Sequence, residues 1–234
     1  MRTLENQKRL YNQLWEQNSP IVATKKTWQP DPIPIYCIGI WLPDELHEEI
    51  QQVLDRLRSF QPDAKHQWLQ PNQLHITLEL PGRLGKHFQE DDVPKMQEWL
   101  QEICKTTDPF QLELGNISCF TNVPFREVYD KECNIFQLHN AIAKKIPWTE
   151  EPTYRFENYT PHMSLCYPGK DATPMVQHPD FQRELPATKM PVGSIYFTVW
   201  CDAEGTPEIE DLAIIELGTG KLLPKKHTSS KIPT

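Results

Sequence analysis

The sequence predicts an α+β fold, in which short strands and helices are mixed in order along the chain. Two observations support this class. Runs of β-branched and aromatic residues or strict apolar–polar alternation recur, as in 35–41 and 73–80. Segments with apolar residues at helical spacing separate such runs, as in 46–57. Roughly three helices and seven strands are expected from these patterns, and their order suggests two related halves.

Residues 1–34 are expected to form an N-terminal extension that packs on the core. Residues 4–17 have a weak helical pattern. The proline-rich stretch 30–34 cannot continue a helix, because each proline restricts the residue before it to extended backbone. We therefore expect an extended strap that leads from this extension to a main domain over 35–222.

The first half of the main domain begins with a buried strand at 35–41. The helix that follows has Asp44 and Glu45 in its first turn, where the helix dipole favours acidic side chains. Alternation over 73–80 predicts a half-buried strand, and a second helical pattern covers 93–106.

The second half contains more strands than the first. Five strands are expected, at 110–120, 124–130, 162–167, 191–201 and 211–218. Between the second and third of them, 134–146 has the apolar spacing of a helix. Residues 223–234 are polar and rich in lysine, so we expect a flexible tail.

Composition and charge exclude several classes of protein. A hydrophobic content of 38% is too high for a disordered chain, and no apolar run approaches the ~18 residues of a membrane-spanning helix. The first residues lack the apolar stretch of a signal peptide, so we expect a cytoplasmic protein with six reduced cysteines. The net charge of −8 argues against binding to long duplex nucleic acid. A nucleic-acid ligand should be small or held locally.

One short motif, His–apolar–Thr/Ser–apolar, occurs twice. It is HITL at 75–78 and HMSL at 162–165. Threonine and serine make up 24 of 234 residues, so the eight histidines should give roughly one His-x-Thr/Ser by chance. The chain has three, and the third begins at His227 in the lysine-rich tail without apolar neighbours. Chance accounts for that third copy.

Each tetrad lies in a predicted strand, where residues i and i+2 project from the same face. His75 and Thr77 therefore share one face, as do His162 and Ser164, while the apolar members point into the core. If the two strands face each other, two imidazoles and two hydroxyls surround one small cavity.

Such a cavity suits phosphodiester chemistry without a metal. One neutral histidine takes a proton from water or a ribose 2′-hydroxyl, and the other, protonated, gives one to the leaving oxygen. The hydroxyls donate to the non-bridging phosphate oxygens. Histidine fits both roles, because its unperturbed pKa of ~6.5 allows both protonation forms near neutrality.

The two tetrads make the sequence resemble the 2H phosphoesterase superfamily, which includes LigT-like 2′,5′ RNA ligases and cyclic phosphodiesterases. The stretch FQLELGNISCF and the following helix with Leu138-His139 are supporting context. The resemblance covers about 35–220. It implies two pseudo-symmetric lobes, each an antiparallel β-sheet with outer helices, and a central cleft between them.

The resemblance also implies roles for four residues. His75 and His162 become the acid/base pair, and Thr77 and Ser164 become ligands of the phosphate. Serine in the second tetrad is an accepted variant. The constellation is nearly symmetric, so the motif does not say which histidine is the base.

Other interpretations of these positions remain open. Either tetrad alone is better explained by a structural histidine on a strand. Glu79 and Cys166 continue the same faces as Thr77 and Ser164 and either lines the cavity or simply continues its strand. The remaining histidines lack the spacing of metal ligands, so we expect no metal and no cofactor.

Four further residues are candidates for substrate binding. Arg83 and Lys170 follow the two tetrads at matching positions and either meet a phosphate at the cleft mouth or are solvated loop charges. Tyr159 and Tyr167 flank the second tetrad and either stack on a nucleobase, worth ~1–3 kcal/mol, or pack in the core.

The sequence thus predicts a metal-independent phosphodiesterase for a ribose-containing phosphate. Candidate substrates are a 2′,3′-cyclic phosphate, a 2′,5′-linked oligonucleotide and a small cyclic nucleotide, and the reaction is hydrolysis, transesterification or ligation. The alternative is a module of the same fold that binds RNA ends or nucleotides without cleaving them. A third possibility is an interaction scaffold assembled through 1–34. We expect a monomer that binds a small nucleotide or an RNA terminus and no membrane.

Overall fold

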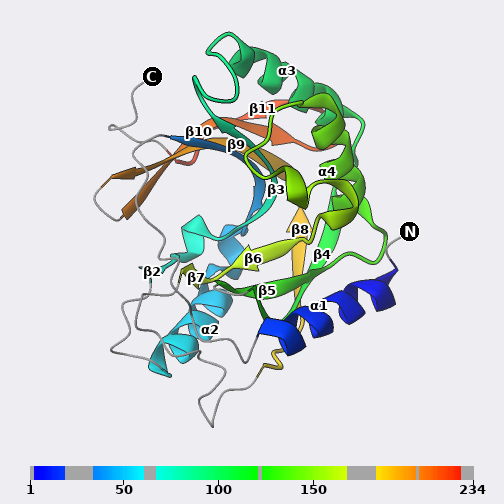
Figure 1. Ribbon diagram of the computed structural model, residues 1–234, viewed down its shortest axis with the longest axis vertical. Helices are drawn as coiled ribbons and strands as arrows, with labels where there is room; N and C mark the ends of the chain where they lie inside the picture. Colours follow the sequence, from blue (N-terminus) through cyan, green and yellow to red (C-terminus); the bar gives the residue numbers. More distant parts are fainter. Residues whose placement is uncertain are drawn as a thin grey trace.

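Nine strands form one antiparallel sheet at the centre of the molecule (Figure 1). The computed structural model describes residues 3–18, 34–60, 67–120, 123–167, 183–203 and 206–227. Within these ranges all neighbouring strands of the sheet are antiparallel. In the described residues one α-helix precedes the strands and three lie between them in the sequence, so the α+β class is confirmed.

The strands are named in chain order, and the sheet takes them up in a different order. From edge to edge it contains β11 (Leu222–Leu223), β10 (Thr206–Glu216), β9 (Ser194–Ala203), β1 (Ile35–Trp41), β3 (His75–Arg83), β6 (His162–Ser164), β5 (Val123–Tyr129), β4 (Phe110–Phe120) and β8 (Thr188–Val192). A separate two-stranded sheet pairs β2 (Gln67–Trp68) with β7 (Cys166–Tyr167). The helices are α1 (Leu4–Asn18), α2 (His47–Ser59), α3 (Asp92–Lys105) and α4 (Asn134–Lys145).

The sheet can be divided at its centre into two halves, and the C-terminal strands join the first strands of the main domain. The strands from β11 to β3 form one half, and those from β6 to β8 form the other. A single residue pair, Ile76 and Met163, joins β3 to β6. Both side chains are fully buried in the main hydrophobic core. The two tetrads therefore lie on neighbouring strands, and their apolar members hold the halves together.

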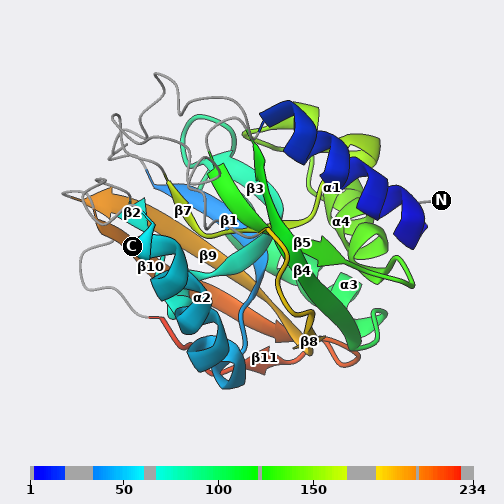
Figure 2. The same cartoon turned by 90° about the horizontal axis from the view of Figure 1, so that it is seen from below.

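Helices α2, α3 and α4 bury their apolar stripes in that same core. Met96, Leu100 and Cys104 follow one another at helical spacing on α3 and are all fully buried. Helix α3 packs on β9 and β10, and α4 packs on β3. Figure 2 shows α1 at the upper right and α2 at the lower left of the molecule. Helix α2 is tied to the opposite half of the sheet, where the Thr188 hydroxyl of β8 donates to Glu49.

Two smaller clusters cover parts of the other face of the sheet. Beside β1 and β9, the buried cluster comprises Cys37, Trp41, Tyr196, Ile209 and Ile214. Beside β4 and β5, it comprises Tyr11, Phe125 and Tyr129. Tyr11 comes from α1, which packs on β4 and β5. Between these clusters, the middle of this face carries the polar members of the tetrads.

Several element boundaries differ from the sequence-based expectation. The strand expected at 162–167 is split at Leu165, because β7 leaves the large sheet and pairs with β2. The strand expected at 191–201 is two strands that separate at Gly193. Strand β3 continues to Arg83 past a register shift with β1, and Gly82 there has a φ of 107°, which glycine adopts readily.

The two chain ends are described only in part. The expected strap at 30–34 lies almost wholly outside the described residues, and so does the tail from residue 228. Before that point, the buried Asp211 carboxylate accepts hydrogen bonds from the backbone N–H groups of Lys226 and His227. Residues 226–227 are thereby held against β10. The described helices include none with the length and apolar character needed to cross a membrane.

Candidate active site

The register of β3 and β6 brings the polar members of both tetrads to one face. Ile76 is paired with Met163 in antiparallel register. Extending this register places His75 opposite Ser164 and Thr77 opposite His162. The two histidines are then diagonal neighbours, a relation that separates Cα atoms by about 7–8 Å. This spacing leaves room for a phosphoryl group between the two rings.

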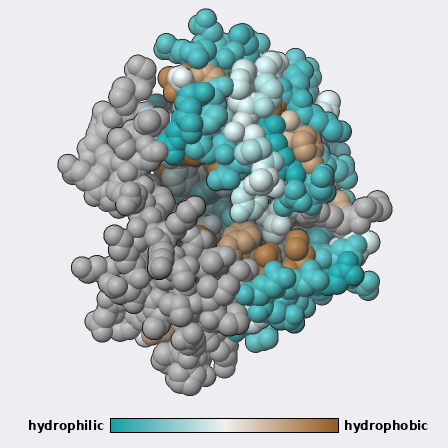
Figure 3. Space-filling view, viewed as in Figure 1, coloured by the Kyte–Doolittle hydropathy of each residue, from teal (hydrophilic) through white to brown (hydrophobic). Residues whose placement is uncertain are grey.

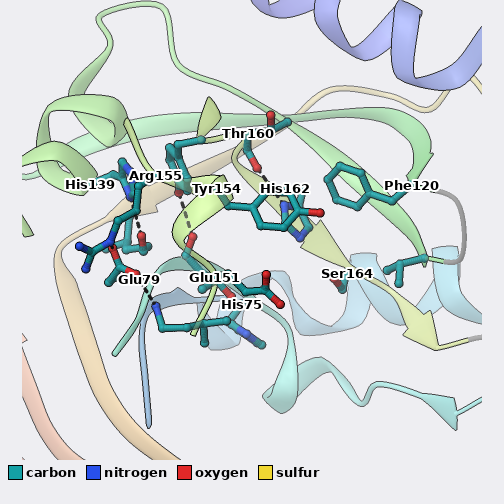
Figure 4. Close-up of a pocket in the computed structure, with 15 residues that line it drawn as sticks. His75, Glu79, Phe120, His139, Glu151, Tyr154, Arg155, Thr160, His162 and Ser164 are labelled. Atoms are coloured by element: carbon teal, nitrogen blue, oxygen red, sulfur yellow. Dashed lines mark hydrogen bonds and ion pairs between the residues drawn. The ribbon is translucent and has the colours of Figure 1, made fainter. Parts of the chain in front are cut away.

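A cavity of about 310 Å³ lies over these residues. Both histidines, Thr77 and Ser164 line it. In the space-filling view the same face of the molecule is hollowed near its centre (Figure 3). In the close-up, His75 and His162 lie in the middle of the cavity, with Glu79 and Arg155 towards one end and Phe120 towards the other (Figure 4).

Each imidazole is held by a hydrogen bond from Nδ1 to a backbone carbonyl two residues earlier in the chain. His75 Nδ1 lies 2.9 Å from the Gln73 carbonyl oxygen, and His162 Nδ1 lies 2.9 Å from the Thr160 carbonyl oxygen. A carbonyl can only accept, so each Nδ1 must carry a proton. In the neutral ring the remaining nitrogen, Nε2, then has a free lone pair. Each ring is therefore set to exchange a proton through Nε2.

Aromatic side chains surround each ring and keep water away from it. Trp41 is stacked on His75 with ring centroids 4.8 Å apart. Phe120 meets His162 edge-on at 4.8 Å, and Phe125 lies 5.3 Å from the same ring. Burial disfavours the charged imidazolium. It lowers the pKa of His75 to about 4 and also lowers the pKa of His162.

The tetrad hydroxyls complete the polar floor of the cavity. Thr77 and Ser164 are both partly exposed to it. The Thr77 side chain also makes a hydrogen bond with Cys37, whose thiol pKa is raised by burial to about 12 and which therefore stays protonated. Two hydroxyls on adjacent strands can donate to the oxygens of one phosphate.

Glu79 and Arg155 form an ion pair at one end of the cavity. Arg155 Nε donates to a Glu79 carboxylate oxygen at 2.8 Å, and Thr149 donates to the other oxygen at 2.8 Å. Burial raises the pKa of Glu79, and the Arg155 charge opposes that shift. Glu79 thus lines the cavity, as one of the two open interpretations held. Sequence reasoning missed Arg155, because no motif surrounds it.

The segment 149–160 forms one wall of the cavity and is fastened to β3. Arg155 Nη2 donates to the carbonyl oxygens of Ile146 and Trp148. His139 Nδ1 donates to the Leu78 carbonyl oxygen at 2.6 Å, and its Nε2 accepts from the Phe156 N–H at 3.0 Å. Both ring nitrogens of His139 are occupied, so this histidine has a structural role.

Two tyrosines of this segment line the cavity in different ways. Tyr159 is buried, is stacked on His139 at 3.9 Å and donates its hydroxyl to the Thr77 carbonyl oxygen. One face of its ring is thus covered by His139 and the side chain is buried, which favours the core alternative. Tyr154 was not among the expected residues, yet it lines the cavity with 54% of its surface exposed.

Within the described residues, the other candidates for substrate binding do not line the cavity. Arg83 is paired with Glu150, with Nε 3.5 Å from a carboxylate oxygen, and is not among the lining residues. Lys170 and the side chain of Tyr167 lie outside the described parts. Cys166 is fully buried and does not line the cavity, and burial raises the pKa of its thiol.

Metal ligands do not gather in the part of the chain that the structure describes. No group of three or more His, Cys, Asp or Glu side chains is arranged there to hold an ion. The site is described by its two imidazoles, two hydroxyls and one buried ion pair.

Comparison with known proteins gives matches that span most of the chain. The family model of the 2′-5′ RNA ligase superfamily matches residues 42–204. An RNA 2′,3′-cyclic phosphodiesterase of Bacillus subtilis (strain 168) is 31% identical over 159 residues, which are 62% of this chain and 78% of the relative. Both tetrads lie inside the range that the family model matches.

Solved structures share the fold at low identity. TT0787 of Thermus thermophilus matches with a TM-score of 0.58 and 17% identity, over 79% of this chain and 98% of that one. LigT of E. coli complexed with NADP⁺ matches with a TM-score of 0.59 and 18% identity, over 80% of this chain and 99% of that one. The resemblance inferred from the two tetrads is therefore confirmed, and the chain belongs to the 2′-5′ RNA ligase superfamily of 2H phosphoesterases.

Proposed function

We propose that the protein hydrolyses 2′,3′-cyclic phosphates at the end of RNA or on a nucleotide. The observation that carries this is the matched pair of histidines. Each Nδ1 is fixed by a carbonyl two residues earlier in the chain, so each Nε2 is free to exchange a proton. The Bacillus subtilis relative is named as an RNA 2′,3′-cyclic phosphodiesterase, which supports this choice among the substrates that the motif allows.

The reaction needs one base and one acid on opposite sides of the phosphorus. One neutral Nε2 takes a proton from water as the water oxygen bonds to phosphorus. The protonated Nε2 of the other ring gives its proton to the ribose oxygen as the P–O bond to that oxygen breaks. The ring opens to a phosphomonoester, and the two histidines have exchanged protonation states. Thr77 and Ser164 donate to the non-bridging oxygens, which gain charge in the transition state.

The motif does not distinguish the two histidines. Burial lowers the pKa of both, and repulsion from His162 lowers that of His75 further. As part of the proposal we assign His75 as the base and His162 as the acid, which corresponds to a singly protonated site with the proton on His162. A bound phosphate anion favours that state, because the anion stabilises an adjacent imidazolium.

Tyr154 offers a binding surface for the nucleobase. Its ring is more than half exposed and lines the same cavity as the histidines. Stacking on such a ring tolerates any base and contributes ~1–3 kcal/mol per base. Tyr154 thus replaces Tyr159 as our candidate for stacking, and RNA ends of different sequence are expected to bind.

Chromatography of products from a substrate panel tests this function. The panel contains 2′,3′-cyclic nucleotides, 2′,5′-oligoadenylates and cyclic oligonucleotides, with and without EDTA. We expect phosphomonoesters from the 2′,3′-cyclic substrates at a rate that EDTA leaves unchanged. Tight binding of these substrates without product would contradict hydrolysis and favour the alternative, a nucleotide-binding module. The cytoplasmic location and monomeric state stay predictions.

A further inference from the structure

The strand that carries His162 has little support of its own. Strand β6 is three residues long and is joined to β3 by a single pair. On its other side it pairs with β5, through Phe125–Ser164, Arg126–Met163 and Glu127–His162. Continuing this register, the next pair would be Val128 with Pro161.

Proline leaves that next pair incomplete. In an antiparallel ladder, residues that exchange both hydrogen bonds alternate with residues that exchange none. The Leu165 N–H donates to Pro124 on the same pair of strands, so counting by two makes Val128–Pro161 a hydrogen-bonding position. Pro161 has no N–H and cannot donate to Val128. The ladder therefore lacks a donor directly before His162.

The hydroxyl of Tyr11 occupies this place. It lies 2.9 Å from the Val128 carbonyl oxygen, and the Val128 N–H donates to it at 3.3 Å. It is also within hydrogen-bonding distance of the Pro161 carbonyl oxygen. Its single proton serves one carbonyl at a time, while its oxygen accepts from Val128. Tyr11 thus bridges β5 to the residue that precedes His162.

A second path leads from Tyr11 to His162 through packed rings. The Tyr11 ring lies 6.1 Å from the ring of Phe125, and Phe125 lies 5.3 Å from the ring of His162. Phe125 is opposite Ser164 in the register, so both contacts are on the catalytic face of the sheet. The backbone directly before His162 therefore contacts Tyr11 of α1, and the His162 ring is connected to Tyr11 through Phe125.

Helix α1 is anchored firmly enough to serve as such a support. Tyr11 is 1% exposed, and the Ser118 hydroxyl donates to its carbonyl oxygen. The buried Gln7 side chain donates to the Asp130 carbonyl oxygen at 2.7 Å and accepts from the Asp130 N–H at 2.9 Å. This helix lies outside residues 42–204, the range matched by the family model.

We infer that Tyr11 is a positioning residue for His162, and that α1 is a working part of the active site. By closing the ladder at Val128 and Pro161, Tyr11 fixes the Thr160–His162 backbone. That backbone also supplies the Thr160 carbonyl that orients the His162 ring. The inference rests on the proposed catalytic role of His162.

The variant Tyr11→Phe tests it, because this change removes the hydroxyl and keeps the ring. Tyr129→Phe is the matched control, since Tyr129 belongs to the same buried cluster but its hydroxyl donates to Glu127. We expect kcat for a 2′,3′-cyclic nucleotide to fall about tenfold in Tyr11→Phe with KM unchanged, as for a slightly misplaced acid. Tyr129→Phe should keep its kcat within about twofold at a similar melting temperature.

A readout independent of activity separates this inference from the proposed reaction. Nitrogen-15 NMR of the imidazoles reports which ring nitrogen carries the proton. We expect the His162 signals to move away from the pure Nδ1–H form in Tyr11→Phe, with the His75 signals unchanged and neither ring affected in Tyr129→Phe. Unchanged His162 signals, or equal changes in both variants, would overturn the inference even if the enzyme cleaves its substrate. If the wild-type protein is inactive and the His162 signals still change in Tyr11→Phe, the inference on positioning stands and only the proposed function is refuted.

Discussion

The two halves of the sheet present the same chemistry on different supports. His75 lies at the start of the nine-residue strand β3, which pairs along its length with β1. His162 lies on a three-residue strand that depends on β5 and on Tyr11 of the N-terminal helix. Nevertheless, each ring has a backbone carbonyl oxygen 2.9 Å from its Nδ1, two residues earlier in the chain. Each also has an aromatic ring whose centroid lies 4.8 Å from its own.

The features that the halves share are those that we propose the chemistry requires. A hydrogen bond from Nδ1 to a backbone carbonyl and an aromatic neighbour occur in both halves. The length of the strand and the source of its support differ between the halves. Substitutions in each half test whether both are equally necessary.

The largest expected effect comes from removing either imidazole. His75→Ala and His162→Ala should each lower kcat by about 10²- to 10⁴-fold on a 2′,3′-cyclic nucleotide, because each loses one proton-transfer group. A 2′-deoxynucleoside 3′-(4-nitrophenyl) phosphate has a leaving group that needs no acid, and it has no 2′-hydroxyl, so water remains the nucleophile. It should restore turnover in His162→Ala and leave His75→Ala slow.

His87→Ala is the control for both variants, since His87 Nδ1 accepts a hydrogen bond from the Arg83 N–H and the side chain does not line the cavity. Steady-state rates of all three variants on the two substrates give the comparison. Full activity of either tetrad variant would refute the paired mechanism. Rescue of His75→Ala in place of His162→Ala would reverse the assignment of base and acid.

Smaller losses are expected from the hydroxyls. Thr77→Val and Ser164→Ala should each lower kcat by about 10²-fold, because one donor to the transition-state oxygens is lost. Thr77→Ser and Ser164→Thr keep the hydroxyl and should retain most of the activity. If the hydroxyls only support the strands, the melting temperatures of the variants will fall in parallel with their kcat values. In that case Thr77→Ser and Ser164→Thr will not retain turnover.

A still smaller effect is expected at the cavity wall. Tyr154→Ala should raise KM by about 5- to 150-fold with little change in kcat, the equivalent of ~1–3 kcal/mol of base stacking. Phe156→Ala is the control, because Phe156 is exposed on the same segment and does not line the cavity. Equal KM changes in the two variants would indicate a general loosening of the segment.

The pH–rate profile should be a bell whose optimum is set by the lowered pKa values of the two histidines. The base must be neutral and the acid protonated, so kcat/KM rises through the lower pKa and falls through the upper one. Burial lowers the pKa of His75 to about 4 and also lowers that of His162. The bell should therefore have its optimum below the ordinary histidine pKa of ~6.5. An optimum above that value in steady-state profiles would contradict the lowered pKa values.

The residues that share the candidate catalytic face could be predicted from the sequence. Alternation in HITL and HMSL indicates which residues share a face, and that local rule needs no knowledge of the fold. The α+β class follows from the same kind of pattern. What alternation does not give is the partner of a strand, so the split of 162–167 at Leu165 and the pairing of β7 with β2 were missed.

The residues that sequence reasoning missed depend on distant contacts. Arg155 reaches Glu79 across 76 positions, and Tyr11 reaches Pro161 across 150. Neither has a motif around it. Conversely, Arg83 follows its tetrad as a cleft residue would, yet Glu150 holds it elsewhere. Position beside a motif is thus a weaker guide to this site than alternation within it.

The single pair between Ile76 and Met163 has a consequence for how the halves align. Because side chains alternate along a strand, a slip by one residue would turn His162 and Ser164 into the core and expose Met163. Burial of two fully enclosed apolar side chains therefore selects the register that also aligns the imidazoles. Hydrophobic packing on one side of the sheet thus sets the distance between the two imidazoles on the other side.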